Sequence, residues 1–320
     1  MTTPLTSLAD LYAAAQRIHG HVHRTTQARS DYISRRANAE VSLKLELFQK
    51  TGSFKVRGVI NTLKQLSGQE RSRGVISMSA GNHAQALAWG AAALGMSAVI
   101  VMPMTAAPSK VQATQGYGGT VVQTDGDLLA TAQQLQHERG LTLIHPFDDP
   151  RIIAGQGTVG LEIMQDVSDV DVVLIACGGG GLLSGVAAAV KGMRPEVRVI
   201  GVEPELSNVM SLSLAAGAPQ RLVVNRTVAD GLAPPFTGVN AFTHVRALVD
   251  EVITVSDAEI IEGMKVLMER CKLFAEPAAG AAVAPLLNGR VRVPAGSRVV
   301  PVVCGGNVDF GRLRDMLGSS

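Results

Sequence analysis

The sequence predicts an α/β protein with parallel sheets covered by helices, and three observations support this fold class. Short apolar runs recur along the 320 residues, separated by stretches long enough for helices. Three glycine-containing turns directly follow such runs, and Gly and Ala are abundant, as in strand-turn-helix units. The strands are predicted at 98–101, 120–122, 141–144, 172–175, 197–202, 252–255 and 299–303.

Lys55 is the first candidate catalytic residue. The run 41–47 before it alternates apolar and polar residues as a strand does, and Ser53 is predicted to cap a helix running towards Leu66. Lys55 would then lie in the first helical turn, where the partial positive charge of free N–H groups disfavours an ammonium. Apolar neighbours add a desolvation penalty in the same direction. A neutral lysine amine attacks carbonyl groups, whereas a solvated surface lysine is the ordinary alternative.

The second feature is a run of four glycines, Gly178 to Gly181, between the strand at 172–175 and a small-residue helix at 186–190. Successive N–H groups of such a loop can point at one anion, with the helix N-terminus behind them. The spacing matches neither the dinucleotide fingerprint nor a P-loop. A tight turn needs only one or two glycines, and the central glycines argue against a membrane span over 172–190. The loop therefore predicts a phosphate site.

Two further turns carry polar side chains. Ser79-Ala80-Gly81-Asn82-His83 precedes a helix through Leu87 and Leu94, and its side chains and N–H groups suit a carboxylate or a phenolic oxygen. Cys304-Gly305-Gly306-Asn307 follows the strand at 299–303. Sites of parallel sheets lie at the carboxyl ends of strands, which is where all three glycine turns are predicted.

Lys55 and these turns resemble the fold-type II (tryptophan synthase β-like) pyridoxal phosphate enzymes of the threonine dehydratase, serine dehydratase and serine racemase group. The resemblance covers nearly the whole chain. It implies two doubly wound open-sheet domains with pyridoxal 5'-phosphate in the cleft between them. The motifs that carry it are Ser53-Phe54-Lys55, Ser79-Ala80-Gly81-Asn82-His83, His145-Pro146-Phe147, Gly155-Gln156-Gly157-Thr158, Gly178 to Gly181, Glu203-Pro204, Val228-Ala229-Asp230-Gly231, Glu276-Pro277 and Cys304-Gly305-Gly306-Asn307.

The resemblance implies roles for single residues. Lys55 corresponds to the Schiff-base lysine, which holds the cofactor and later acts on the α-proton of the substrate. Asn82 corresponds to the residue that hydrogen-bonds the ring oxygen of the cofactor, and Phe54 to the one that packs beside the ring. Cys304 stands beside the ring nitrogen, where many members have Ser, and Glu276 is a further candidate near the ring. The phosphate cradle would consist of Gly178, Gly179, Gly180, Gly181 and Leu182.

The residues Ser79, Ala80, Gly81, Asn82 and His83 correspond to the loop that holds the substrate carboxylate. In racemases of the family a second Ser stands at the position of Ala80 and exchanges a proton on the other face of the substrate. Because an alanine cannot exchange a proton, this departure favours dehydration over racemisation.

The nature of Cys304 bears on the reaction. A neutral Cys at the ring nitrogen makes a shallower electron sink than a carboxylate would, which favours prompt loss of a β-leaving group. The predicted reaction is β-elimination of water from a small β-hydroxy amino acid, L-threonine and/or L-serine, giving a 2-oxo acid and ammonia. Lys55 would remove the α-proton, and the family implies the cofactor's phosphate as the acid. The two substrates differ by one methyl, worth only ~1–3 kcal/mol, so the sequence does not predict the preference.

Other functions share these motifs. They are serine racemisation, dehydration of hydroxyaspartate or phenylserine, and β-replacement. From a different class, a nonenzymatic amino-acid sensor could reuse the fold, but it would have no use for Lys55. His145 is predicted to be structural or to lie at a domain junction, and Trp89 to be a packing residue.

Charge and cysteine usage narrow the possible partners. The net charge of +2 indicates neither a nucleic-acid nor a membrane surface. The three cysteines lack metal or disulfide spacing, and no signal peptide is recognised, so the cytoplasm is the predicted location. Glu203 stands where the cation site of the family begins, but the polar or acidic side chain expected at Val209 is missing. A valine cannot ligate a hard cation, which argues against metal activation.

The resemblance also suggests the domain organisation. A small domain is expected at 74–148, and a large cofactor-binding domain at 1–73 plus 149–320. The chain stops soon after a helix near Arg312, so we expect no C-terminal regulatory domain of the kind found in biosynthetic threonine dehydratases. A homodimer is the usual state of the family.

Overall fold

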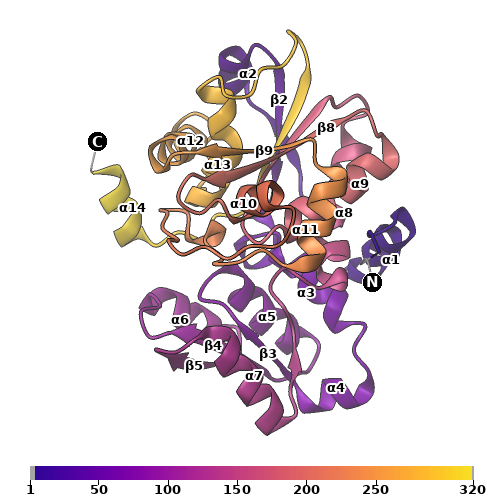
Figure 1. The fold of residues 1–320 in the computed structure, drawn as a ribbon, viewed down its shortest axis with the longest axis vertical. Helices are drawn as coiled ribbons and strands as arrows, with labels where there is room; N and C mark the ends of the chain where they lie inside the picture. Colours follow the sequence, from indigo (N-terminus) through magenta and orange to yellow (C-terminus); the bar gives the residue numbers. More distant parts are fainter. Residues whose placement is uncertain (1–3, 319–320) are drawn as a thin grey trace.

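The computed structural model describes residues 4–318 and contains two separate sheets (Figure 1). The larger sheet pairs its first two strands antiparallel and all its other neighbours parallel. In spatial order its strands are β1 (Gln27–Arg29), β2 (Glu40–Leu45), β10 (Arg298–Val303), β7 (Val172–Ala176), β8 (Arg198–Pro204) and β9 (Glu251–Val255). The predicted α/β class is therefore confirmed.

The smaller sheet occupies the lower part of Figure 1, and its four strands are all parallel. In spatial order they are β5 (Thr120–Thr124), β4 (Ala98–Pro103), β3 (Val75–Met78) and β6 (Thr142–Leu143). Each of the seven strands predicted as a range overlaps a strand of the structure.

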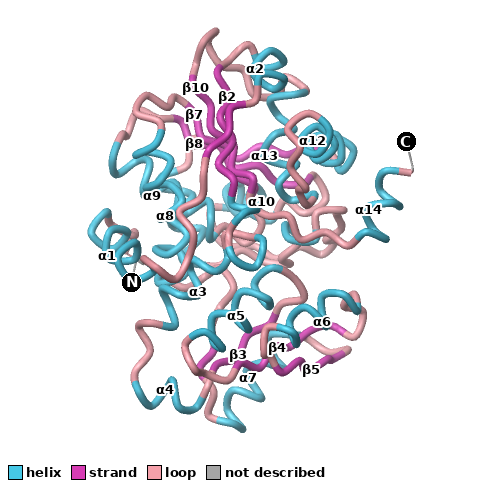
Figure 2. Tube along the Cα trace, turned by 180° about the vertical axis from the view of Figure 1, so that it is seen from behind, coloured by secondary structure: helices cyan, strands magenta, loops and turns pink. Residues whose placement is uncertain are grey.

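Helices connect the strands of both sheets. In Figure 2 the larger sheet lies between α8 and α9 on one side and α12 and α13 on the other. None of the helices between residues 4 and 318 combines the length and the apolar character that a bilayer crossing requires. Around the larger sheet lie α1 (Leu8–Ile18), α2 (Asp31–Ala37), α3 (Lys55–Leu63), α8 (Pro150–Asp166), α9 (Gly181–Met193), α10 (Val209–Ala216), α11 (Val239–Leu248), α12 (Asp257–Glu269), α13 (Pro277–Leu287) and α14 (Phe310–Leu317). Near the smaller sheet lie α4 (Gly68–Arg73), α5 (Asn82–Ala93), α6 (Pro108–Gly116) and α7 (Leu128–Arg139).

One local prediction differs from the structure, and one strand was not predicted. Ser53 does not cap a helix, because it pairs with Gly305 in an isolated β-bridge, and α3 begins at Lys55 with Phe54 in the cap position. Lys55 nevertheless lies in the first helical turn, as predicted. Strand β1 was not predicted, since only three residues form it, and their pairing with β2 rather than their own pattern makes them a strand.

Helix α8 holds α3 and α9 at a fixed distance. A Cβ on Gly155 would lie 2.5 Å from the Cα of Gly58 on α3, and a Cβ on Gly157 would lie 2.7 Å from the carbonyl oxygen of Gly185 on α9. Only glycines allow backbones to approach this closely. The glycine pair of α8 thus fixes the helix that begins with Lys55 relative to the helix that follows the four-glycine loop.

A buried group of four charged side chains adds to the contact between α3 and α8. The guanidinium of Arg57 donates to Glu46 and Glu162 at 2.7–2.9 Å, and the ammonium of Lys44 donates to Glu162 at 2.6 Å. Arg57, Lys44 and Glu46 are fully buried. Because two cations face two anions, the charges are paired, and the pairing ties α3 to β2 and α8.

Candidate functional site

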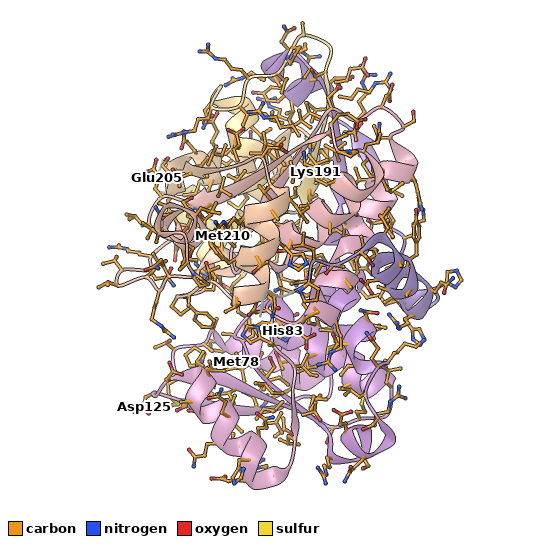
Figure 3. All side chains as sticks on the ribbon, turned by 45° about the vertical axis from the view of Figure 1, so that its right-hand side comes forward. Met78, His83, Asp125, Lys191, Glu205 and Met210 are labelled. Carbon is orange, nitrogen blue, oxygen red and sulfur yellow. The ribbon has the colours of Figure 1, made fainter. Side chains whose placement is uncertain are left out.

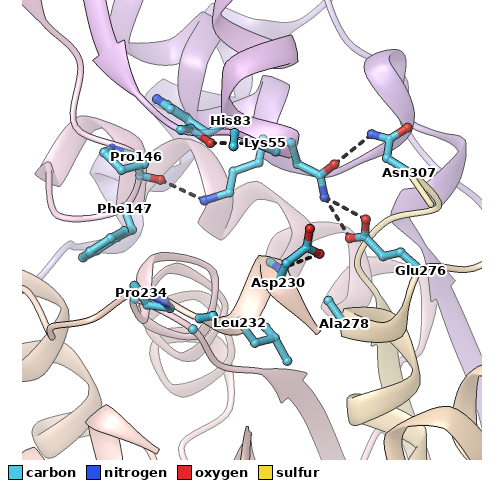
Figure 4. Close-up of a pocket in the computed structure, with 18 of the residues that line it drawn as sticks. Lys55, His83, Pro146, Phe147, Asp230, Leu232, Pro234, Glu276, Ala278 and Asn307 are labelled. Atoms are coloured by element: carbon cyan, nitrogen blue, oxygen red, sulfur yellow. Dashed lines mark hydrogen bonds between the residues drawn. The ribbon is translucent and has the colours of Figure 1, made fainter. Parts of the chain in front are cut away.

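A cavity of about 620 Å³ lies where the turns after β3, β7 and β10 meet the start of α3. Figure 4 shows part of its lining, and Figure 3 shows His83 near the middle of the molecule, between Met210 and Asp125. The structure brings together every residue for which the sequence predicted cofactor or substrate contact. These are Phe54, Lys55, Ser79, Ala80, Gly81, Asn82, His83, Gly178, Gly179, Gly180, Gly181, Leu182, Glu276 and Cys304.

Lys55 extends into this cavity from the first turn of α3. Its Nζ donates a hydrogen bond of 2.9 Å to the carbonyl oxygen of Pro146 (Figure 4). It also lies 5.2 Å from the ring centre of Phe54. Burial lowers the pKa of Lys55 from 10.5 to about 8, while Cys304 and Glu276 act in the opposite direction. A substantial fraction of this amine is therefore neutral near pH 8 and able to act as a nucleophile or a base.

The four-glycine loop presents free N–H groups to the cavity. Among residues 4–318, the N–H groups of Gly179, Gly180, Gly181 and Leu182 have no hydrogen-bond partner. Gly180 has a φ of 88° and is the N-cap of α9, whose positive end lies behind the loop. A row of free N–H groups at a helix start fits a phosphate.

The ring of Phe147 packs on one side of this loop. A Cβ on Gly179 would lie 2.4 Å from the ring, so no other residue fits without moving it. Gly179 is therefore required for packing against Phe147 as well as for the direction of the N–H groups. The sequence alone indicated only the second reason.

A second helix start faces the cavity at Ser79 to His83. Helix α5 begins at Asn82, and the N–H groups of Ala80, Asn82 and His83 have no partner among residues 4–318. The N–H of Gly81 is held by the side chain of Ser79 at 3.1 Å. This arrangement can hold a carboxylate by backbone N–H groups.

The side chain of His83 points into the protein. Its Nε2 lies 3.0 Å from Oγ of Ser77, and that hydroxyl donates to the carbonyl oxygen of Ile144 at 2.6 Å. Since Ser77 uses its only hydrogen on Ile144, Nε2 of His83 carries the hydrogen and donates. Burial keeps the pKa of His83 well below 6.5, so the ring is neutral, and only the backbone of His83 is available to an anion.

Glu276 and Cys304 line the same cavity, and Glu276 contacts the side-chain amide of Asn82. The Nδ2 of Asn82 donates to both carboxylate oxygens of Glu276, at 2.8 and 3.0 Å (Figure 4). Burial raises the pKa of Glu276 to about 7, and the hydrogen bond from Asn82 opposes this shift. Burial also raises the pKa of the Cys304 thiol well above 9, so Cys304 is a neutral group.

Several lining residues were absent from the predicted site. Pro146, Phe147 and Asp230 line the cavity, and all three belong to motifs that carried the resemblance without an assigned role. Asp230 forms ion pairs with Lys110 on α6 and with Arg312 on α14, at 2.9 Å for the latter. These ion pairs join α6, which lies near the smaller sheet, to α14 and the Asp230 segment, which lie near the larger sheet.

Glu203 lies outside the cavity. Its carboxylate accepts hydrogen bonds of 2.7–2.8 Å from the N–H of Met210 and from the N–H and hydroxyl of Ser211. It therefore caps the start of α10. Within residues 4–318, no three or more His, Cys, Asp or Glu side chains are grouped so that they could hold a metal ion.

Three comparisons with known proteins agree with this geometry. The family model described as pyridoxal-phosphate dependent enzyme matches residues 18–305. The L-threonine ammonia-lyase of Thermotoga maritima is 43% identical, over 95% of this chain and 76% of that protein. The catabolic L-threonine dehydratase of Escherichia coli (strain K12) is 40% identical, over 98% of this chain and 96% of that protein. The solved structure of maize serine racemase has a TM-score of 0.93 at 36% identity, covering 99% of this chain and 98% of that one.

Proposed function

Because this chain belongs to the pyridoxal-phosphate dependent enzymes, we propose that it removes water from L-threonine or L-serine and releases ammonia. The observation that carries the proposal is Lys55, an amine of pKa about 8 in one cavity with two helix starts that offer free N–H groups. Relatives named for threonine dehydration, about 40% identical along most of the chain, support this substrate class.

The residues of the cavity fit the cofactor. When bound, pyridoxal phosphate supplies an electron sink for the bonds at the substrate's α-carbon. The N–H groups of Gly179 to Leu182 would hold its phosphate, and Phe54 would pack beside its ring. The neutral Cys304 thiol would lie at the ring nitrogen, while Asn82 and Glu276 would lie near the ring oxygen.

Groups of the chain itself would then bind the substrate carboxylate and remove the α-proton. The free N–H groups at Ala80, Asn82 and His83 would hold its carboxylate. The neutral amine of Lys55 would take the proton from the α-carbon. The β-hydroxyl would leave as water after accepting a proton, for which the resemblance implies the phosphate group as the donor, and the proton gained by Lys55 would restore that donor. The enamine released becomes a 2-oxo acid and ammonia by hydrolysis, so atoms balance without another reactant.

Serine racemisation is a second candidate, supported by the likeness to maize serine racemase. Ala80 argues against it. Its methyl group lines the cavity but cannot exchange a proton with the face of the substrate opposite Lys55.

The test begins with a visible spectrum of the purified protein, followed by L-threonine and L-serine with detection of 2-oxo acid. We expect a cofactor band and release of 2-oxo acid. Lys55→Ala should abolish the response of the cofactor band to substrate and lower the release of 2-oxo acid by about 10²–10⁴-fold or more, the range typical of lost proton transfer. The exposed Lys272→Ala is the control. A band without release would favour racemisation or another β-hydroxy amino acid, and the absence of a band after adding pyridoxal phosphate would refute the proposal.

We propose domain boundaries at 74 and 148, with a large domain formed by the remaining residues; its ends, 1–3 and 319–320, lie outside the described residues. The separate sheet of β3 to β6 supports these boundaries. Val56 and Val59 of α3 belong to the apolar core that also contains α5, so α3 packs against both parts.

We further propose a homodimer and a cytoplasmic location. The free cysteines Cys177, Cys271 and Cys304 suit a reducing compartment. Light scattering of the purified protein tests the dimer.

A further inference from the structure

A four-residue turn, His145 to Asp148, leads the chain from β6 back towards the larger sheet. The Nδ1 of His145 accepts hydrogen bonds from the N–H groups of Phe147, at 3.3 Å, and Asp148, at 2.9 Å. Since both partners are donors, Nδ1 carries a lone pair. The imidazole closes the turn as an Asn side chain does in an Asx turn, by accepting the N–H two residues further on.

The three residues held by this turn each contact the site. The carbonyl oxygen of Pro146 accepts the hydrogen bond from Nζ of Lys55 at 2.9 Å. The ring of Phe147 packs against Gly179 of the four-glycine loop. The carboxylate of Asp148 accepts the N–H of Ala241 on α11 at 2.9 Å. The turn therefore touches both the reactive amine and the anion-binding loop.

His145 is built to stay neutral. It is partly buried and packs edge-on against Phe147, with 4.6 Å between ring centres. Burial lowers the pKa of His145 below 6.5, and Lys55 acts in the same direction, while Asp148 and Asp149 oppose the shift. A neutral ring keeps the Nδ1 lone pair available to the turn at neutral pH.

We propose that His145 is a positioning residue for Lys55. Its Nδ1 fixes the turn, and the turn aims the Pro146 carbonyl at Lys55 whenever that amine is free. The amine is free before the cofactor is loaded and while substrate occupies the site. This inference rests on the proposed function, because it concerns the same lysine.

Two amides of equal polarity test the proposal. In His145→Asn the side-chain oxygen can accept the same N–H groups, whereas in His145→Gln an extra methylene carries the oxygen out of reach. For the holoenzyme with L-threonine we expect kcat to fall about tenfold in His145→Gln, which corresponds to the loss of one hydrogen bond. In His145→Asn we expect kcat to stay within about threefold of the unmodified protein. KM should change little in either variant. His137→Gln, on the exposed face of α7, is the control.

A second readout does not depend on the substrate. Trinitrobenzenesulfonate labelling of Lys55, followed by peptide mass spectrometry in the full-length cofactor-free chain, should have its midpoint near pH 8. A carbonyl acceptor favours the ammonium, so the midpoint should fall by about one pH unit in His145→Gln but not in His145→Asn. The proposal would be overturned if both variants kept the kcat and the labelling midpoint of the unmodified protein. It would also be overturned if His145→Asn lost as much kcat as His145→Gln. If no ammonia is released by any variant, the proposed reaction fails, while the labelling still decides the role of His145.

Discussion

The side-chain amide of Asn82 donates to both carboxylate oxygens of Glu276, at 2.8 and 3.0 Å, although the two residues are 194 positions apart. Asn307 fixes the orientation of this amide by donating to its oxygen at 2.8 Å. Asn82 begins α5 beside the smaller sheet, and Glu276 precedes α13 on the larger one. The pair therefore joins the two halves of the cavity at the position proposed for the cofactor ring.

Glu276 predicts a pH dependence of stability. Its pKa is raised from 4.5 to about 7 by burial, so the folded chain retains a proton that the unfolded chain releases between these values. The contribution of this group is present below pH 4.5 and is lost as the pH rises through about 7. Urea unfolding of the cofactor-free chain at pH 5 and 7.5 should show a loss of stability that is smaller by about 2 kcal/mol in Glu276→Gln. The exposed Glu196→Gln should keep the dependence, and equal slopes in all three proteins would contradict the prediction.

Gly179→Ala should weaken cofactor binding. The added Cβ would lie 2.4 Å from the ring of Phe147, so the ring or the loop must move. Overpacking of this kind costs about 1–3 kcal/mol, which corresponds to a dissociation constant about 5–150 times larger. Titration of the visible band with pyridoxal phosphate measures the change. Gly116→Ala is the matched control, because a Cβ there meets nothing within 4 Å. Unchanged affinity in Gly179→Ala would show that the loop adapts.

Ala80→Ser should introduce proton exchange at the α-carbon. The new hydroxyl would line the cavity in the loop proposed to hold the substrate carboxylate. Incorporation of deuterium from D₂O and chiral chromatography of serine measure the exchange, with an expected gain of up to roughly 10²-fold. Ala113→Ser, at another lining position, is the control. If Ala80→Ser exchanges no faster than Ala113→Ser, a hydroxyl at this position is not sufficient for racemisation.

Glu162→Gln should destabilise the fold strongly. It removes the carboxylate that accepts from Lys44 and from Arg57, both fully buried, and leaves an excess of buried positive charge. Breaking such a pair costs about 3–5 kcal/mol. Urea unfolding at neutral pH tests this. Glu251→Gln breaks the partly exposed pair with Arg198 and should cost less than about 1 kcal/mol. If the two variants lost similar free energies of unfolding, the buried ion pairs of Glu162 would contribute no more to stability than the partly exposed pair of Glu251.

Much of the fold was predictable because it depends on local pattern. The continuous apolar run of β7 is buried at every position, as parallel strands covered on both faces are. The edge strand β1 and the position of Ser53 were missed, since both are defined by pairing with distant segments. In the site, the motif residues line one cavity, while the roles given to them stay predictions, and His83 was predicted only as part of the carboxylate loop. Its side chain turns inward because Nε2 bonds to the hydroxyl of Ser77 on β3, and that hydroxyl is itself held by the carbonyl oxygen of Ile144.

The sequence by itself determined the α/β class, the glycine turns at strand ends and the choice of Lys55, because residue type and spacing along the chain specify each of them. Only the tertiary structure decided which carbonyl receives the Lys55 amine, why Gly179 must be glycine and which carboxylate faces Asn82. Pro146, Phe147 and Glu276 reach the site from segments far away in the chain, so their contacts exist only in the folded protein. Burial in that assembled cavity, rather than the helix start alone, is the main cause of the lowered pKa of Lys55.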